Sequence, residues 1–294
     1  MRAGGDAASG RLAIIAGGGL LPHYLADAAR RNGENPLIIQ LLDEPAPEWQ
    51  GFDVKHASVG DFAGIRQLFE RYSISRVVMS GSVRRRPEWR QIRPTFSFLA
   101  RVPFVLKTLR RGGDNAVLEM VIALLEALGC KVIGAHEIAP DLLAAPGPVG
   151  TVQPDAEAQE DIRVAMDAAL QLGRLDIGQG AVAVGGRVVA LEGPEGTDAM
   201  LARVAEMRAN GRISRRRKGV LVKLAKPQQD ERADLPALGL TTLRNASLAG
   251  LSGIVGEAGR SLVLDRAELA QAADAAGMFI TGIEISRADV PEAQ

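Results

Sequence analysis

The sequence of 294 residues contains a single cysteine, Cys130, which excludes an intrachain disulfide. Such scarcity is typical of a protein that works in a reducing compartment. Cys130 lies where an expected helix gives way to an expected strand, and no neighbouring residue would lower the pKa of its thiol. We therefore expect a buried structural cysteine rather than a catalytic thiol.

Neither sign of charge is in excess, because 35 Lys and Arg residues balance 35 Asp and Glu residues. No global field therefore recruits nucleic acid, and any electrostatic recognition must be local. The chain also lacks an apolar run of about 18 residues, the length that would span a membrane. Its N-terminus has no apolar core of a signal peptide. We expect a cytoplasmic protein with a flexible segment at residues 1–10.

The three histidines, His23, His56 and His136, lack the spacing of a zinc site. His136 follows an expected strand, at the edge where parallel sheets bind ligands, although a hydrogen-bonded structural role is an alternative. The segment around Ser252 lacks the final glycine of a nucleophile elbow. Residues 259–261 carry arginine where a P-loop has lysine. These absences exclude serine hydrolases and P-loop nucleotidases.

Strands alternate with helices along the chain, which indicates an α/β protein with parallel strands. The length favours two domains of roughly 150 residues each. We expect a Rossmann-like N-terminal domain at residues 11–139, a Pro- and Gly-rich linker at 140–154, and a catalytic C-terminal domain of mixed α/β structure at 155–294.

The expected elements follow from apolar periodicity and from glycine and proline positions. In the first domain the strands are residues 12–16, 36–42, 76–80 and 131–134, and the helices are 20–31 and 115–128. In the second domain the helices are residues 155–172, 198–209, 241–249 and 266–276. Its strands are residues 181–184, 187–191, 219–224, 253–255, 261–265 and 279–282.

Gly17, Gly18 and Gly19 follow the first expected strand and precede a helix. Glycines let the backbone approach an anion, and the N–H groups at the start of the helix would point at a phosphate. The dinucleotide pattern is incomplete because Pro22 stands at its third glycine, although Asp43 mimics the ribose-binding acid of such folds. A nicotinamide or flavin, another phosphate-bearing ligand, and a tight structural turn all stay open.

Five acidic residues have no obvious ion-pair partner in the sequence: Asp176, Glu195, Asp198, Asp230 and Asp234. They stand beside glycines that form the corners of short strands. Carboxylates in this setting suit a hydrated Mg²⁺ ion and a phosphate, because Mg²⁺ prefers oxygen ligands and keeps several waters. The pattern favours phosphoryl chemistry.

Two groups of candidate residues in the second domain also have a purely structural interpretation. Thr197 is expected to cap the following helix with Asp198 in its first turn, and capping alone would explain both residues. Lys223, Lys226 and Arg232 belong to a strand end and a loop held by prolines, where cations would neutralise phosphate charge. A solvated charged loop is the alternative there.

Residues 76–111 contain ten Lys or Arg residues and one acid, Glu88, interleaved with aromatic and aliphatic side chains. This composition suits a surface that holds anionic headgroups while burying acyl carbon. Binding of single-stranded RNA and a plain amphipathic exterior helix are the alternatives.

Four ordered blocks, at residues 173–180, 192–201, 223–239 and 250–260, resemble the LpxI type of UDP-2,3-diacylglucosamine pyrophosphatase, a family of the lipid A pathway. A weaker likeness at residues 12–19 and 134–137 extends the resemblance over nearly the whole chain. The resemblance implies hydrolysis of UDP-2,3-diacylglucosamine to UMP and 2,3-diacylglucosamine 1-phosphate, assisted by Mg²⁺. It also implies a cytoplasmic enzyme that is peripheral on the inner membrane.

Asp234, in the sequence Asp-Leu-Pro, matches the essential aspartate of that family, which implies that it is catalytic and binds the metal. Asp230 and Asp198 are further catalytic candidates. The expected substrate-binding residues are Gly17, Gly18, Gly19, Gln179, Glu195, Thr197, Lys223, Lys226 and Arg232. The expected partners are the lipid nucleotide and the membrane surface, without nucleic acid, in a homodimer, the commonest symmetric assembly. The rival interpretation is a nucleotide-binding regulatory protein without turnover.

Overall fold

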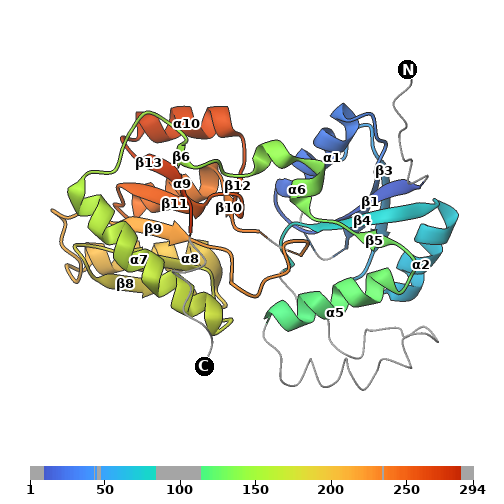
Figure 1. The fold of residues 1–294 in the computed structure, drawn as a ribbon, viewed down its shortest axis with the longest axis horizontal. Coiled ribbons are helices and arrows are strands. Elements are labelled where there is room, and N and C mark those ends of the chain that lie inside the picture. The colour runs from blue at the N-terminus through green and yellow to red at the C-terminus, as the bar shows by residue number, and fades with distance from the viewer. Residues whose placement is uncertain (1–9, 43, 45–47, 84–113, 234, 286–294) are drawn as a thin grey trace. The chain divides into compact units, whose positions relative to one another are not determined.

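The computed structural model describes residues 10–42, 44, 48–83, 114–233 and 235–285. The chain forms two compact units, each with its own sheet (Figure 1). The first unit comprises Met1–Pro140 together with Asp230–Asp234, and the second comprises Asp141–Gln229 together with Leu235–Gln294. The expected α/β class is confirmed.

The first unit is built on a five-stranded parallel sheet with the order β3-β2-β1-β4-β5. Its strands are β1 (Arg11–Ala16), β2 (Leu37–Leu41), β3 (Asp53–Ala57), β4 (Ile74–Ser80) and β5 (Lys131–Val132). β1 and β2 are buried almost throughout, as their continuous apolar runs predict. The chain winds outward on either side of β1, and this Rossmann-like order makes the carboxyl ends of β1 and β4 a switch point.

Helices cover both faces of this sheet (Figure 1). α2 (Phe62–Arg71) and α5 (Asp114–Glu126) pack on the face that carries Ala13 and Ile15 of β1. α1 (Leu21–Arg31) and α6 (Ala135–Ile138) lie on the opposite face. The sequence does not predict β3 or α2. β3 lacks an apolar run because it is an edge strand, and only its last residue is buried.

The second unit contains a six-stranded mixed sheet with the order β6-β13-β11-β9-β7-β8. Its strands are β6 (Gly147–Pro148), β7 (Gly180–Ala183), β8 (Val188–Leu191), β9 (Val220–Lys223), β11 (Gly253–Glu257) and β13 (Phe279–Ile283). β9, β11 and β13 are parallel, whereas β7 runs antiparallel to both β8 and β9. A separate two-stranded sheet pairs β10 (Ala237–Leu238) with β12 (Leu262–Val263).

Helices also cover both faces of the second sheet. α7 (Ala156–Arg174) packs against one face, and α8 (Gly196–Ala209), α9 (Leu240–Leu248) and α10 (Arg266–Ala275) pack against the other. The β7–β8 turn is tied to α7, because the N–H groups of Gly185 and Gly186 donate to the buried Asp161 at 3.1 and 2.6 Å. Both glycines have positive φ, the backbone that a tight hairpin turn requires.

The boundary between the units differs from the expected linker at residues 140–154. Residues from 141 onward belong to the second unit, where Leu143 bridges Leu262 and Ala144 is buried in the core. β6 also pairs with β13. Prolines prevent long regular elements in this segment, but apolar burial and strand pairing still hold it in the domain. Conversely, Asp230–Asp234, expected in the C-terminal domain, groups with the first unit.

Cys130 follows α5 and precedes β5, and it is buried as expected. Its thiol donates a hydrogen bond to the carbonyl of Leu125 at 3.1 Å. Burial raises the pKa of the thiol to about 11. Across the ranges that the structure describes, no helix combines the length and the apolarity needed to cross a membrane.

Candidate functional site

Several of the expected site residues lie at one edge of the second sheet, the edge formed by the ends of its strands and not by an outer strand. β9 and β11 end at this edge, β7 begins there, and β8 ends there. Gly180 of β7 stands opposite Lys223 of β9, and the N–H of Glu192, just after β8, donates to the Gly180 carbonyl at 2.9 Å. Lys223, Gly180 and Glu192 therefore form a row across three adjacent strands. The carboxyl edge of parallel strands is the common position of ligand sites in α/β proteins.

The two lysines of the site have different environments. Lys223 is 6% exposed, and its Nζ donates to the carbonyl of Ala237 at 3.2 Å. Lys226 lies three residues later and forms an ion pair with Asp176, with 2.6 Å between Nζ and Oδ1. The carboxylate neutralises part of the Lys226 charge, so Lys223 is the stronger cation for a ligand at this edge.

Gln179 lies immediately before β7, at the same edge. Its backbone carbonyl accepts a hydrogen bond from the N–H of Leu224 at 2.9 Å, which joins the start of β7 to the end of β9. Its side-chain Oε1 is buried and has no hydrogen-bond partner within the described ranges. The structure therefore places Gln179 beside the strand that carries Lys223.

The start of α8 brings three more expected residues to the end of β8. Glu195 is the N-cap residue and Gly196 begins the helix, so Thr197 lies in the first turn and is not the cap that we expected. The Thr197 hydroxyl donates to Oε1 of Glu192 at 2.9 Å. Asp198, also in the first turn, accepts a hydrogen bond from Asn245 at 2.8 Å. Glu195 pairs with Arg203 at 3.1 Å.

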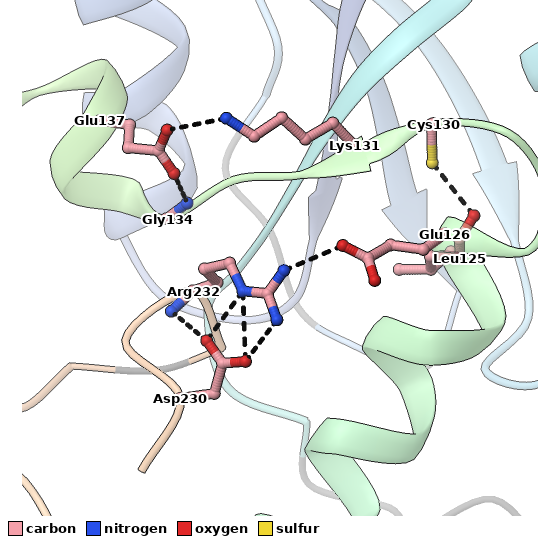
Figure 2. Close-up of polar contacts among 8 residues, drawn as sticks. All are labelled: Leu125, Glu126, Cys130, Lys131, Gly134, Glu137, Asp230 and Arg232. Carbon is pink, nitrogen blue, oxygen red and sulfur yellow. Dashed lines mark hydrogen bonds and ion pairs between the residues drawn. The ribbon is translucent and has the colours of Figure 1, made fainter.

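The loop after β9 contains Asp230 and Arg232, which contact each other directly (Figure 2). The guanidinium also reaches Glu126 of α5, with 2.9 Å between Nη1 and Oε1. Hydrogen bonds from Arg232 lower the pKa of the Asp230 carboxyl. Ala233 packs against the hydrophobic core of the first unit. The loop is therefore held on the first unit by one ionic cluster and one apolar contact.

The acidic residues that lack evident partners in the sequence have partners in the fold. Asp176 pairs with Lys226, Glu195 with Arg203, Asp198 with Asn245, and Asp230 with Arg232. Within the described ranges, no group of three or more His, Cys, Asp or Glu side chains is arranged to hold a metal ion. The fifth acid, Asp234, lies outside the described residues.

The glycine run after β1 makes the contacts of a tight structural turn, one of the three interpretations that the sequence left open. The N–H groups of Gly17 and Gly18 donate to the carbonyls of Ser80 and Ser82, both at 2.8 Å. A Cβ on Gly17 would lie only 2.4 Å from the Ser82 carbonyl, so glycine is needed for this close approach. These two N–H groups are occupied by the chain itself. Gly19, which is exposed and has a φ of 95°, is the member of the run that faces open space.

Other expected features fall outside the described residues. They are Asp43 and most of the basic, aromatic segment, residues 84–113. Two buried acids at this edge of the second sheet, Glu192 after β8 and Glu257 at the end of β11, are not among the candidates that the sequence singled out. Glu192 also contacts Thr197, which the sequence did single out. Its position directly after an expected strand, inside the block 192–201, was the available signal.

Comparisons with known proteins agree with the two-unit architecture. A family model described as the LpxI N-terminal domain matches residues 11–142, and one described as the LpxI C-terminal domain matches residues 145–281. The UDP-2,3-diacylglucosamine pyrophosphatase LpxI of Caulobacter vibrioides is 40% identical to the chain over 276 residues. That alignment covers 93% of this chain and 98% of the relative.

Proposed function

The chain belongs to the LpxI family, and we propose that it hydrolyses the diphosphate of UDP-2,3-diacylglucosamine to UMP and 2,3-diacylglucosamine 1-phosphate. The observation that carries the proposal is the 40% identity to an enzyme named for that substrate, over 93% of the chain. Both domain models match in order, with only two residues between them. The activity is that of a hydrolase acting on a phosphorus anhydride.

Hydrolysis requires water to attack one phosphorus while fixed positive charge stabilises the developing negative charge. Lys223 and Lys226, at the carboxyl edge of the second sheet, are the proposed phosphate contacts. Arg232 is less suited to that role because Asp230 and Glu126 already share its guanidinium. We assign Arg232 to holding the loop that leads to Asp234.

Dependence on Mg²⁺ is part of the same proposal. Proteins commonly hold this ion with one or two carboxylates together with substrate phosphates. Arg232 engages both carboxylate oxygens of Asp230, which supports Asp234 as the protein ligand. A bound ion would neutralise charge on the phosphoryl oxygens.

We also propose that the protein works at the cytoplasmic surface of the inner membrane, as a homodimer. Two acyl chains hold the substrate in the bilayer, and the enzyme must reach it there. Burial of hydrocarbon contributes about 0.8 kcal/mol per CH₂, so an apolar receiving surface would favour binding strongly. Sedimentation with anionic vesicles tests the membrane location, and the molecular mass in solution tests the homodimer.

The decisive experiment is release of UMP from UDP-2,3-diacylglucosamine by the purified protein. We expect release with Mg²⁺, none with EDTA, and full recovery when Mg²⁺ is restored. A protein that binds a nucleotide or reduced nicotinamide at micromolar concentration, yet releases no UMP at any metal concentration, would instead be the regulatory protein of the rival interpretation.

A further inference from the structure

Glu192 is a buried carboxylate that the fold satisfies on one side only. The residue is 6% exposed. Its Oε1 accepts the hydroxyl hydrogen of Thr197 at 2.9 Å. Its Oε2 is buried and has no hydrogen-bond partner among the residues that the structure describes. Anchoring of α8 through Thr197 accounts for the first oxygen but leaves the second one unexplained.

The second oxygen lies above Gly180, the neighbouring residue in the row across the sheet. A Cβ on Gly180 would lie 2.5 Å from Oε2, so the carboxylate occupies space that any other residue would fill. Lys223 stands on the far side of Gly180 in the same register. Adjacent strands are about 4.8 Å apart, which places the backbones of Glu192 and Lys223 about 10 Å from each other. Glycine therefore separates a buried acceptor from a buried cation.

Leaving one buried carboxylate oxygen without a donor is unfavourable, because that oxygen has lost its hydrogen bonds to water and has gained no protein donor. The N-terminus of the 14-residue helix α8 favours negative charge nearby, so a carboxylate is compatible with this position. Unsatisfied groups of this kind occur where a ligand completes the hydrogen bonds. The terminal torsion of glutamate is broad, so the carboxylate can turn toward such a ligand at little cost.

We infer that Glu192 is a substrate-binding residue whose Oε2 accepts a hydrogen bond from a ring hydroxyl of the nucleotide sugar, while Lys223 contacts the adjoining phosphate. This inference rests on the proposed function. The pairing of an acceptor with a cation fits a sugar phosphate, which offers hydroxyl donors beside an anion. Both ends of the substrate have this chemistry, namely the uridine ribose with its 5′-phosphate and the glucosamine ring with its 1-phosphate.

The test compares Glu192→Gln with Glu206→Gln, a matched change at an exposed carboxylate of α8. For Glu192→Gln we expect KM for UDP-2,3-diacylglucosamine to rise on the order of 10-fold or more, as for loss of a hydrogen bond to a charged group. We expect kcat to change by less than about 3-fold, because binding rather than chemistry is affected. Glu206→Gln should match the parent protein in both constants.

Thermal unfolding of the same proteins distinguishes binding from a structural role. Because the amide removes a buried unpaired charge, Glu192→Gln should unfold at the same temperature as the parent or at a higher one. A lower unfolding temperature with an unchanged KM would show that Glu192 only anchors α8, and would overturn the inference. Thr197→Val should lower the unfolding temperature and raise KM less than Glu192→Gln does.

Calorimetry with UMP and with glucosamine 1-phosphate identifies the ring that Glu192 contacts. The ligand whose affinity falls in Glu192→Gln, and not in Glu206→Gln, carries the hydroxyl. Equal affinities of both ligands for parent and Glu192→Gln, together with an unchanged KM, would overturn the inference while UMP release by the parent still supported the proposed function. Failure of the parent to release UMP would instead remove the proposed function, and the two binding measurements would still decide the role of Glu192.

Discussion

Arg232 holds both carboxylate oxygens of Asp230, with Nε 3.0 Å from Oδ1 and Nη2 2.6 Å from Oδ2 (Figure 2). The same guanidinium reaches Glu126 near the end of α5, so one arginine joins the loop after β9 to a helix more than 100 residues earlier in the chain. Two-point pairing of this kind fixes orientation as well as position. The loop is thus held immediately before Asp234.

Replacement of Arg232 by Ala should therefore destabilise the first unit at neutral pH, by about 1 to 2 kcal/mol. Arg232 lowers the pKa of Asp230, and such a carboxyl contributes stability above its unfolded value of about 4 and loses it as the pH falls through the folded pKa. The difference between Arg232→Ala and the parent should consequently be largest near pH 7 and shrink below about pH 4. Urea unfolding of both proteins near pH 7 and below about pH 4 measures this difference in the free energy of unfolding.

Arg66→Ala provides the matched control, because Arg66 pairs with Glu70 on the exposed surface of α2. We expect a change of about 0.5 kcal/mol or less for that variant. An Arg232→Ala protein whose unfolding matches Arg66→Ala at pH 7 would contradict the anchoring role.

Asp234→Ala or Asp234→Asn should fold normally and lose turnover by on the order of 10²-fold or more, because metal-oriented water supplies several kcal/mol of barrier lowering. Binding of the lipid nucleotide should persist. Initial rates of UMP release in Mg²⁺ measure the loss, with Asp141→Asn as an exposed acidic control. Turnover near that of the parent would remove Asp234 from the catalytic assignment.

Cys130 should react slowly with thiol reagents in the folded protein. Burial raises the pKa of its thiol to about 11, so little thiolate forms at pH 8, and the sulfur is also shielded. Colorimetric thiol titration at pH 8 should show rapid reaction only after unfolding in urea. Rapid labelling of the folded protein, with activity retained, would show that the structure around Cys130 opens to solvent.

The basic, aromatic segment carries a prediction that comes from the sequence, because residues 84–113 lie outside the described ranges. Changing Phe98 and Phe104 to Ser should raise KM for the diacylated substrate and weaken binding to anionic vesicles, since both residues are expected to receive hydrocarbon. Changing Arg84, Arg85 and Arg86 should mainly increase the sensitivity to salt. Vesicle sedimentation and kinetics at low substrate measure both effects. If both variants match the parent protein in vesicle sedimentation and in kinetics, the segment is only a structural exterior.

The sequence by itself determined the class of fold and the family. Buried strands such as β1 and β2 need continuous apolar runs, and α7 needs helical periodicity after the capping Asp155, whose side chain accepts the N–H of Ala158 at 2.8 Å. These signals are local, so they survive in a single sequence. β3 left no such signal because one polar edge strand buries little. The family resemblance, confirmed by the two domain matches, likewise depended on ordered motifs.

Tertiary structure alone decided which groups remain available for chemistry. Asp176 lies 50 residues from Lys226, and Gly18 lies 64 residues from Ser82, yet each pair is in hydrogen-bond contact in the fold. The first contact places a carboxylate beside an expected phosphate-binding lysine, and the second occupies an expected phosphate-binding N–H group. Strand order and helix packing bring such partners together, and neither is encoded in the spacing of neighbouring residues. A motif therefore identifies residues capable of binding, whereas their free hydrogen-bonding capacity depends on contacts from distant parts of the chain.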